Sequence, residues 1–258
     1  MVINVIGVLL ILLGAFMLLG LPFSLYYEKG DTSAICYSSL TTILSGISIW
    51  WLTKSAKKNI KKREGYLIVV LGWLSISIFS MLPYIFSGAL PNLIDALFES
   101  MSGLTTTGAT VITDLRGIPE GILFWRSLTQ WLGGMGIIVL TVAIFPILGI
   151  GGVELFVAEA PGPTSDKIHP RIKETAKRLW LIYTSLTVIL TIILCSCGMT
   201  FFDAVNHSLT TMATGGFSTK NESIDYFQNP AIHYWITFFM FIAGTNYTII
   251  YFSLIGKF

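Results

Sequence analysis

The fold is indicated by a short threonine- and glycine-rich stretch, Thr105-Thr106-Thr107-Gly108, which returns further along the chain as Ala213-Thr214-Gly215-Gly216. Each stretch ends a short, partly polar segment that lies between two much longer apolar runs. These segments are too short to cross a bilayer, because a spanning helix needs about 20 predominantly apolar residues. The sequence therefore predicts two half-crossing segments, each held between full membrane spans.

The composition excludes an ordinary water-soluble globule. The chain has 258 residues and a mean hydropathy of +0.74, and only 12% of its residues are charged. Soluble domains carry roughly 25% charged residues. The apolar residues are concentrated in six long runs, which are residues 2–27, 34–53, 66–88, 122–150, 178–200 and 231–255. The prediction is an all-α, multi-pass membrane protein.

Basic residues gather in two of the connecting segments. Of the 16 Lys and Arg residues, six lie in residues 54–63 and five in residues 167–178. The positive-inside rule places such loops in the cytoplasm, and six spans put both on the same side. The amino terminus is then cytoplasmic, and the short segments 92–107 and 202–214 enter from outside. Aromatic residues do not interleave with either basic cluster, so no nucleic-acid partner is expected.

The two short segments match without a gap when Asp95 is placed on Asp203, an offset of 108 residues (203 − 95). The same offset pairs a serine, a threonine and a glycine in each segment: Ser100 with Ser208, Thr106 with Thr214, and Gly108 with Gly216. Asp95 and Asp203 fit the N-cap position of two short helices. An internal repeat of helix, short helix, loop and helix accounts for these matches.

This repeat predicts three regions. Residues 1–60 form two transmembrane helices outside the repeat, residues 61–152 form the first unit, and residues 153–258 form the second.

The repeated loops have a chemistry suited to cations. Irregular backbone at membrane depth is tolerated only where it is buried in protein or lines a watery cavity. A short helix entering from outside points its partly negative carboxyl end toward the membrane interior. The carbonyls that follow can replace the water around an ion, and Gly108 and Gly216 suit the strained backbone this requires. A pair of ordinary surface loops is the alternative, and the matched positions favour an ion site.

Four stretches carry a further resemblance: residues 98–110, 125–137, 207–219 and 243–247. The first and third are similar to the first and second pore loops of the TrkH-type potassium uptake proteins of the Trk/Ktr family. The second, which includes Gln130-Trp131-Leu132-Gly133-Gly134-Met135-Gly136, resembles the helix that follows their first loop. The fourth resembles the small-residue motif of their sixth span. The resemblance extends over nearly the whole chain from about residue 66.

The resemblance implies a potassium-channel-like superfold in which helix–pore-loop–helix units surround a pseudo-fourfold axis, preceded by two extra helices. It implies potassium as substrate, with no other cofactor. The implied filter residues are Thr106, Thr107 and Gly108 from the first loop, and Thr214, Gly215 and Gly216 from the second. Of these, Thr106, Thr107, Thr214 and Gly215 are expected to bind K⁺ through backbone carbonyls.

The resemblance also implies a homodimer in the bacterial inner membrane, in contact with the lipid bilayer and served by a cytoplasmic nucleotide-binding regulatory subunit. This chain carries only two of the four implied units, which is half a filter. It is therefore expected to be a fragment, or to need a second copy or a separate second half. A truncated, non-conducting membrane scaffold is the alternative function. No nucleophile–base pair or carboxylate dyad appears in the sequence, so an enzyme is not expected.

Two further residues in apolar surroundings are singled out by their charge or position. Arg126 is expected either to pair with Glu120 or another acidic residue at the pore mouth, or to extend to the interface. His207 aligns with Glu99, so both are expected to face the outer vestibule, with His207 supporting the filter.

Overall fold

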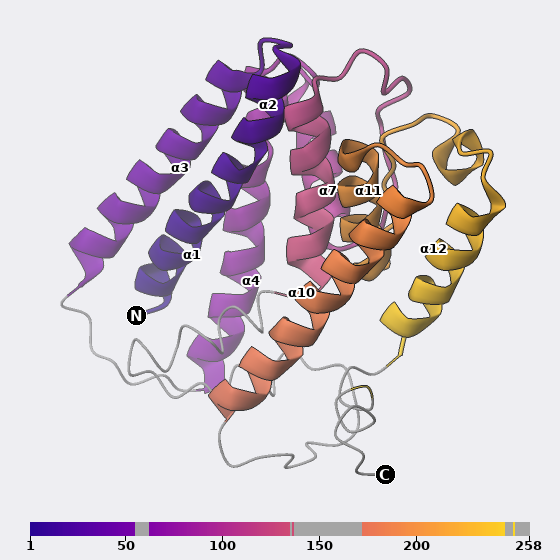
Figure 1. Cartoon of the computed structure of the whole chain (residues 1–258). Helices are drawn as coiled ribbons and strands as arrows, with labels where there is room; N and C mark the ends of the chain where they lie inside the picture. The colour runs from indigo at the N-terminus through magenta and orange to yellow at the C-terminus, as the bar shows by residue number, and fades with distance from the viewer. Residues whose placement is uncertain (55–61, 135, 137–171, 246–249, 251–258) are drawn as a thin grey trace.

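The computed structural model describes residues 1–54, 62–134, 136, 172–245 and 250, and its regular elements within these ranges are all helices (Figure 1). Four helical stretches are long and apolar enough to cross a membrane: Val2–Tyr27, Thr32–Thr53, Glu64–Phe86 and Lys177–Ser196. They confirm four of the six predicted runs as span-length helices. The other two runs begin as helices α7 (Glu120–Gly134) and α12 (Pro230–Ala243), and their remaining residues lie almost entirely outside the described ranges.

The amino-terminal region is a closely packed helical pair. Helix α1 (Val2–Met17) continues through the 3-10 turn η1 (Leu18–Gly20) into α2 (Leu21–Tyr27), and α3 (Thr32–Thr53) returns beside it. Glycines bring the two backbones together, as small residues do between membrane helices. A Cβ added at Gly46 would lie 2.7 Å from the carbonyl oxygen of Gly7.

Gly46→Ala is therefore expected to lower the stability of this pair by about 1–3 kcal/mol, the usual cost of overpacking. The measurement is thermal unfolding of the purified protein in detergent. The control is Gly72→Ala in α4 (Lys62–Ser80), where a Cβ would meet only the side chain of Leu9 at 3.5 Å. Equal unfolding temperatures for the two variants would show that α1 and α3 do not need this close approach.

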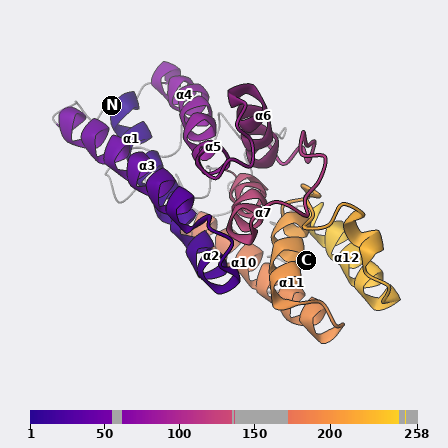
Figure 2. The ribbon, with the colours of Figure 1, turned by 90° about the horizontal axis from the view of Figure 1, so that it is seen from above.

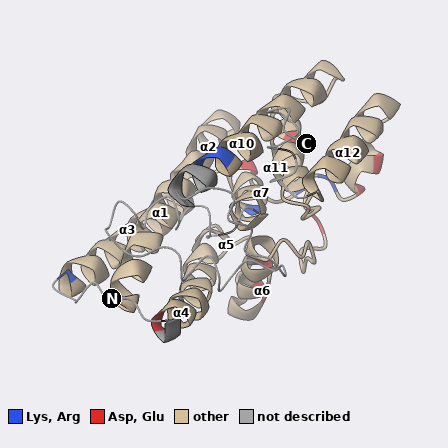
Figure 3. Ribbon diagram, turned by 90° about the horizontal axis from the view of Figure 1, so that it is seen from below, with Lys and Arg blue, Asp and Glu red and all other residues tan. Residues whose placement is uncertain are grey.

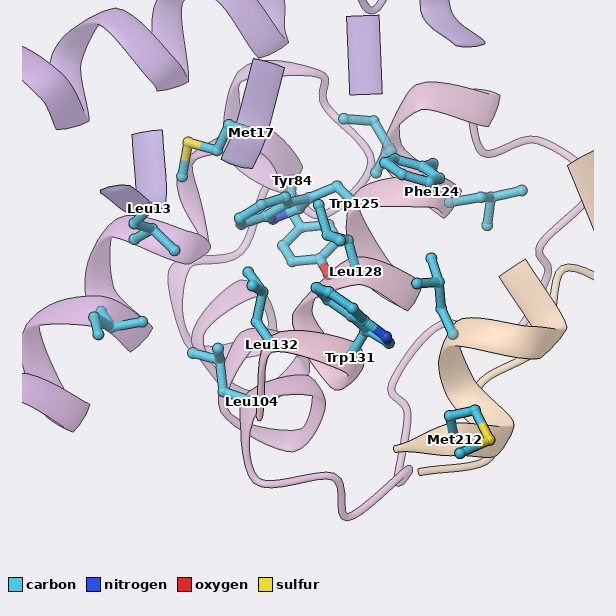
Figure 4. Close-up of a cluster of buried hydrophobic side chains, with 14 of the residues drawn as sticks. Leu13, Met17, Tyr84, Leu104, Phe124, Trp125, Leu128, Trp131, Leu132 and Met212 are labelled. Carbon is cyan, nitrogen blue, oxygen red and sulfur yellow. The ribbon is translucent and has the colours of Figure 1, made fainter. Parts of the chain in front are cut away.

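The chain breaks between the helices α4 and α5 (Leu82–Phe86), and a tryptophan from another helix binds a backbone carbonyl at the break. Pro83 lies in the first turn of α5, and the N–H of Tyr84 donates to the carbonyl of Met81 instead of that of Ser80. The indole Nε1–H of Trp125, from α7, donates to the free carbonyl of Ser80 at 3.0 Å. Trp125 and Tyr84 are both fully buried, and Figure 4 shows them side by side in the core.

The two predicted short segments are short helices of equal length, α6 (Leu93–Leu104) and α11 (Phe201–Met212), with 12 residues each. Helix α6 lies between α5 and α7 in the chain. Helix α11 lies between α10 (Ile172–Ser196) and α12, and the 3-10 turn η2 (Ser223–Tyr226) follows it. Seen from above, α7 occupies the centre, with α6 on one side and α11 on the other (Figure 2).

Charged residues are sparse on the described helices, which are mostly tan in Figure 3. The carboxyl end of α3 and the amino ends of α4 and α10 point to the same side of the bundle, the lower side in Figure 1. The first basic segment, residues 54–63, joins α3 to the start of α4, and the second, residues 167–178, extends into the first turns of α10. Residues 55–61 and 167–171 of these segments lie outside the described ranges.

Candidate functional site

The loops after α6 and α11 begin with the same backbone hydrogen bonds. In each, three consecutive N–H groups donate back to the last turn of the helix, a pattern known as the Schellman motif. The donors and acceptors are Thr105 to Met101, Thr106 to Gly103 and Thr107 to Ser102 after α6, and Ala213 to Leu209, Thr214 to Thr211 and Gly215 to Thr210 after α11. Every pair in the second set is the first set shifted by 108 residues. The repeat found in the sequence is therefore a repeat of backbone geometry.

Left-handed residues also recur at matched positions. Thr106 has φ of 54° and Thr214 has φ of 56°, while Gly108 and Gly216 have φ of 77° and 81°. A non-glycine residue in this region costs about 1–2 kcal/mol. Strain of this kind persists only where the surroundings impose it, and it concentrates at functional sites. Its recurrence at both threonines marks the loops as the candidate site.

The two loops touch each other. A Cβ added at Gly108 would overlap the carbonyl oxygen of Gly215, so the two backbones approach as closely as a glycine allows. Each loop is also partly exposed, at Thr107 in the first and at Thr214 and Gly216 in the second. The two loops thus contact each other and also leave part of each loop exposed.

Helix α7 supports both loops through Arg126, which is only 2% exposed. Its Nε donates to Glu99 Oε1 of α6 at 2.6 Å, and its Nη1 donates to the carbonyl of Ser218 at 3.0 Å. The guanidinium carbon lies 3.6 Å from the centre of the Phe217 ring. A single side chain therefore joins the first short helix to the chain that leaves the second loop.

Glu99 extends this link to the first loop. Its side chain is 0% exposed, and its carboxylate accepts hydrogen bonds from the Thr110 hydroxyl at 2.9 Å and the Val111 N–H at 3.1 Å. A buried carboxylate is stable only with such partners. In the second unit the matched residue is His207, whose ring Nε2 lies 3.4 Å from the hydroxyl of Ser218. Ser218 itself matches Thr110 at the offset of 108.

These positions decide between the alternatives for Arg126 and overturn the expectation for Glu99 and His207. Arg126 forms a buried ion pair, which was one of the alternatives, and its partner is Glu99. Glu120, the partner named first, pairs instead with Lys29 at 2.8 Å. Glu99 and His207 do not face an outer vestibule, because both are buried behind their loops. The sequence could not show the partner of Arg126, because it does not determine how an apolar helix is rotated about its axis and therefore which way its one basic residue points.

The assignment of Asp95 and Asp203 as N-caps is wrong. The N-cap of α6 is Asn92, whose side chain accepts from the N–H of Ile94, and that of α11 is Thr200, whose side chain accepts from the N–H of Asp203. Asp95 and Asp203 lie three residues later, where an acid still suits the positive helix start. The true caps keep the repeat, because 200 − 92 is again 108.

The sequence analysis did not single out Gln130, which lies one helical turn after Arg126 in α7. The Gln130 side chain is fully buried, and its Oε1 accepts the N–H of Phe217 at 3.1 Å. A Cβ added at Gly215 would overlap this amide. The spacing of four residues between Arg126 and Gln130 was the available signal, because it places both on one face of a helix.

The outer parts of the loops are joined as well. The side-chain amide of Asn221 donates to Asp114 at 2.8 Å and its oxygen accepts the Leu115 N–H at 2.8 Å. Hydrogen bonds from Asn221 and from the N–H of Arg116 lower the pKa of Asp114. Two loops far apart in the sequence are thus fixed to each other over several residues.

Comparison with known proteins agrees with this arrangement. A family model described as TrkH, cation transport protein, matches residues 32–257. The chain belongs to this TrkH family. Escherichia coli (strain K12) has a Trk system potassium uptake protein TrkH that is 48% identical over 256 residues, covering 98% of this chain and 53% of that relative. Its Trk system potassium uptake protein TrkG is 37% identical over 253 residues, covering 97% and 52% respectively.

The crystal structure of the potassium transporter TrkH from Vibrio parahaemolyticus matches with a TM-score of 0.83 at 40% identity. The match covers 99% of this chain and 52% of that one, so the chain spans about half the length of the TrkH relatives it matches. Family membership and four span-length helices make this TrkH-family chain a membrane protein, and its regular elements in the described ranges are all helices.

Proposed function

We propose that this chain forms part of a potassium-transporting pore and works as a transporter rather than an enzyme. The observation that carries the proposal is the pair of touching loops, which repeat the same left-handed residues at the carboxyl ends of two matched short helices. The carboxyl end of a helix carries partial negative charge, which favours a cation. Backbone carbonyls in such loops can take the place of an ion's water shell.

The proposed filter consists of Thr106, Thr107 and Gly108 in the first loop and Thr214, Gly215 and Gly216 in the second. Potassium would bind the carbonyls of Thr106, Thr107, Thr214 and Gly215. The strained conformations of Thr106 and Thr214 support this, because a turn at these positions is kept despite its cost in both loops. The names of the relatives, which are potassium uptake proteins, support the choice of ion.

Two units cannot surround an ion, so we infer that a second half completes the ring, either in the same polypeptide or in another. The proposed units are residues 61–152 and 153–258, and residues 1–60 form the added helical pair. We further propose a homodimer with a cytoplasmic nucleotide-binding regulatory subunit in the bacterial inner membrane. The common side of the α3, α4 and α10 ends supports a cytoplasmic amino terminus, because it puts both basic segments on one face.

Complementation of a potassium-uptake-deficient bacterial strain tests the proposal. The chain is expressed alone and as a joined protein, in which the unmatched remainder of the Escherichia coli TrkH relative continues it. We expect the joined protein to restore growth at low potassium. The second candidate, a non-conducting scaffold, would be favoured if both forms insert stably and neither restores growth. Rescue by the chain alone would show that copies of this half can complete the pore.

A further inference from the structure

The amide of Gln130 occupies an unusual place for a polar side chain in a membrane span. It is fully buried in α7 and lies against Gly215, near the point where the two loops meet. Its Oε1 faces the N–H of Phe217, so the amide orientation follows from the donor that it meets. Its Nε2 is buried and has no hydrogen-bond partner among the described residues.

The hydrogen bond from Phe217 determines the direction of a neighbouring carbonyl. In a planar trans peptide the N–H and the C=O point in opposite directions. The N–H of Phe217 points toward Gln130, so the carbonyl of Gly216, in the same peptide unit, points away from it. Gly216 is exposed and has a left-handed backbone, which lets the chain turn at this point.

Arg126 holds the next residues in the same way. Its Nη1 binds the carbonyl of Ser218 at 3.0 Å, and its guanidinium lies over the ring of Phe217. The carbonyl of Ser218 therefore points toward α7, opposite in sense to that of Gly216. The two α7 residues, one helical turn apart, thus hold the Gly216 carbonyl away from the helix and the Ser218 carbonyl toward it.

We propose that Gln130 is a positioning residue for ion selection, which turns the Gly216 carbonyl away from α7 and toward the ion path by holding the N–H of Phe217. The inference rests on the proposed function, since it concerns the same loop. Gln130 itself does not contact the ion. Its loss is expected to change which cation is preferred more than how much protein reaches the membrane.

The test uses the joined protein and measures the ratio of potassium to sodium uptake together with membrane abundance. Gln130→Met keeps the length of the side chain and removes the acceptor, and we expect the ratio to fall about tenfold. Gln130→Glu keeps an acceptor oxygen and should retain most of the potassium-to-sodium uptake ratio of the unsubstituted protein. The matched control is Ser127→Ala, because the buried Ser127 hydroxyl donates to the carbonyl of Leu123 in its own helix.

A second variant removes the donor and leaves every side chain in place. Incorporation of phenyllactate at position 217 by nonsense suppression replaces the backbone N–H with an ester oxygen. We expect the same loss of selectivity, and no further loss when it is combined with Gln130→Met. A normal ratio in both single variants at normal abundance would overturn the inference and leave the proposed function intact, as would an equal loss in Ser127→Ala. If the unsubstituted joined protein transports without preferring potassium, the proposed function and the inference both fail.

Discussion

Gly108→Ala in the joined protein is expected to abolish potassium uptake, whereas Gly216→Ala reduces it only in part. Both glycines are left-handed, so alanine at either position costs about 1–2 kcal/mol of backbone strain. At Gly108 the new Cβ also overlaps a backbone atom, the carbonyl oxygen of Gly215. At Gly216 no atom of the described residues lies within 4 Å of the new Cβ. The overlap cannot be relieved by a side-chain rotation, so the second loop itself must move.

The measurement is the initial rate of potassium uptake at matched membrane abundance. Strain alone at Gly216 should lower the rate about tenfold, the factor that corresponds to 1.4 kcal/mol, and Gly108→Ala should lower it well beyond that. Gly117→Ala is the control, because its Cβ has open space and the backbone there is not left-handed. Equal effects at Gly108 and Gly216 would mean that contact between the loops has no part in transport.

Arg126→Met is expected to destabilise the protein by about 3–5 kcal/mol, the usual penalty for breaking a buried ion pair by removing one partner. The cause is Glu99, whose buried charge would keep the Thr110 hydroxyl and the Val111 N–H as its hydrogen-bond partners among the described residues. Adding Glu99→Gln removes that charge and keeps an oxygen for Thr110. The double variant should therefore recover at least half of the loss.

Thermal unfolding in detergent gives the four stabilities of this double-mutant cycle. Arg116→Met serves as control, because Arg116 pairs with Glu222 at 3.1 Å but the two side chains are 75% and 48% exposed. An exposed pair of this kind contributes about 0–1 kcal/mol. Additive losses from Arg126→Met and Glu99→Gln would contradict a direct energetic link between the two residues.

Much of the fold was predictable because the sequence repeats at a fixed offset. The short segments 92–107 and 202–214 were predicted from their place between long apolar runs, and the offset of 108 matched them to each other. The structure contains helices at Leu93–Leu104 and Phe201–Met212. The caps were misassigned because the sequence offers two cap-forming residues three positions apart at each helix start. Local rules allow Asn92 or Asp95 in the first case, and only the path of the chain before the helix decides between them.

The contacts that support the site could not be predicted from the sequence, for a different reason. Arg126 and Glu99 are 27 residues apart, and Gln130 and Phe217 are 87 residues apart, on elements whose relative rotation the sequence does not determine. The lone basic residue in an apolar run predicted an ion pair as one of two alternatives. Its partner depended on how α7 packs between α6 and α11.

The position of Arg126 also sets an order of events during synthesis. When α7 emerges from the ribosome, Glu99 has already been made, so the two charges can enter the bilayer as a neutral pair. The carbonyl of Ser218, which binds the same guanidinium, is translated 92 residues later. The hydrogen bond from Arg126 to this carbonyl can therefore form only after the second short helix has been made, so the site is complete later than the ion pair inside it.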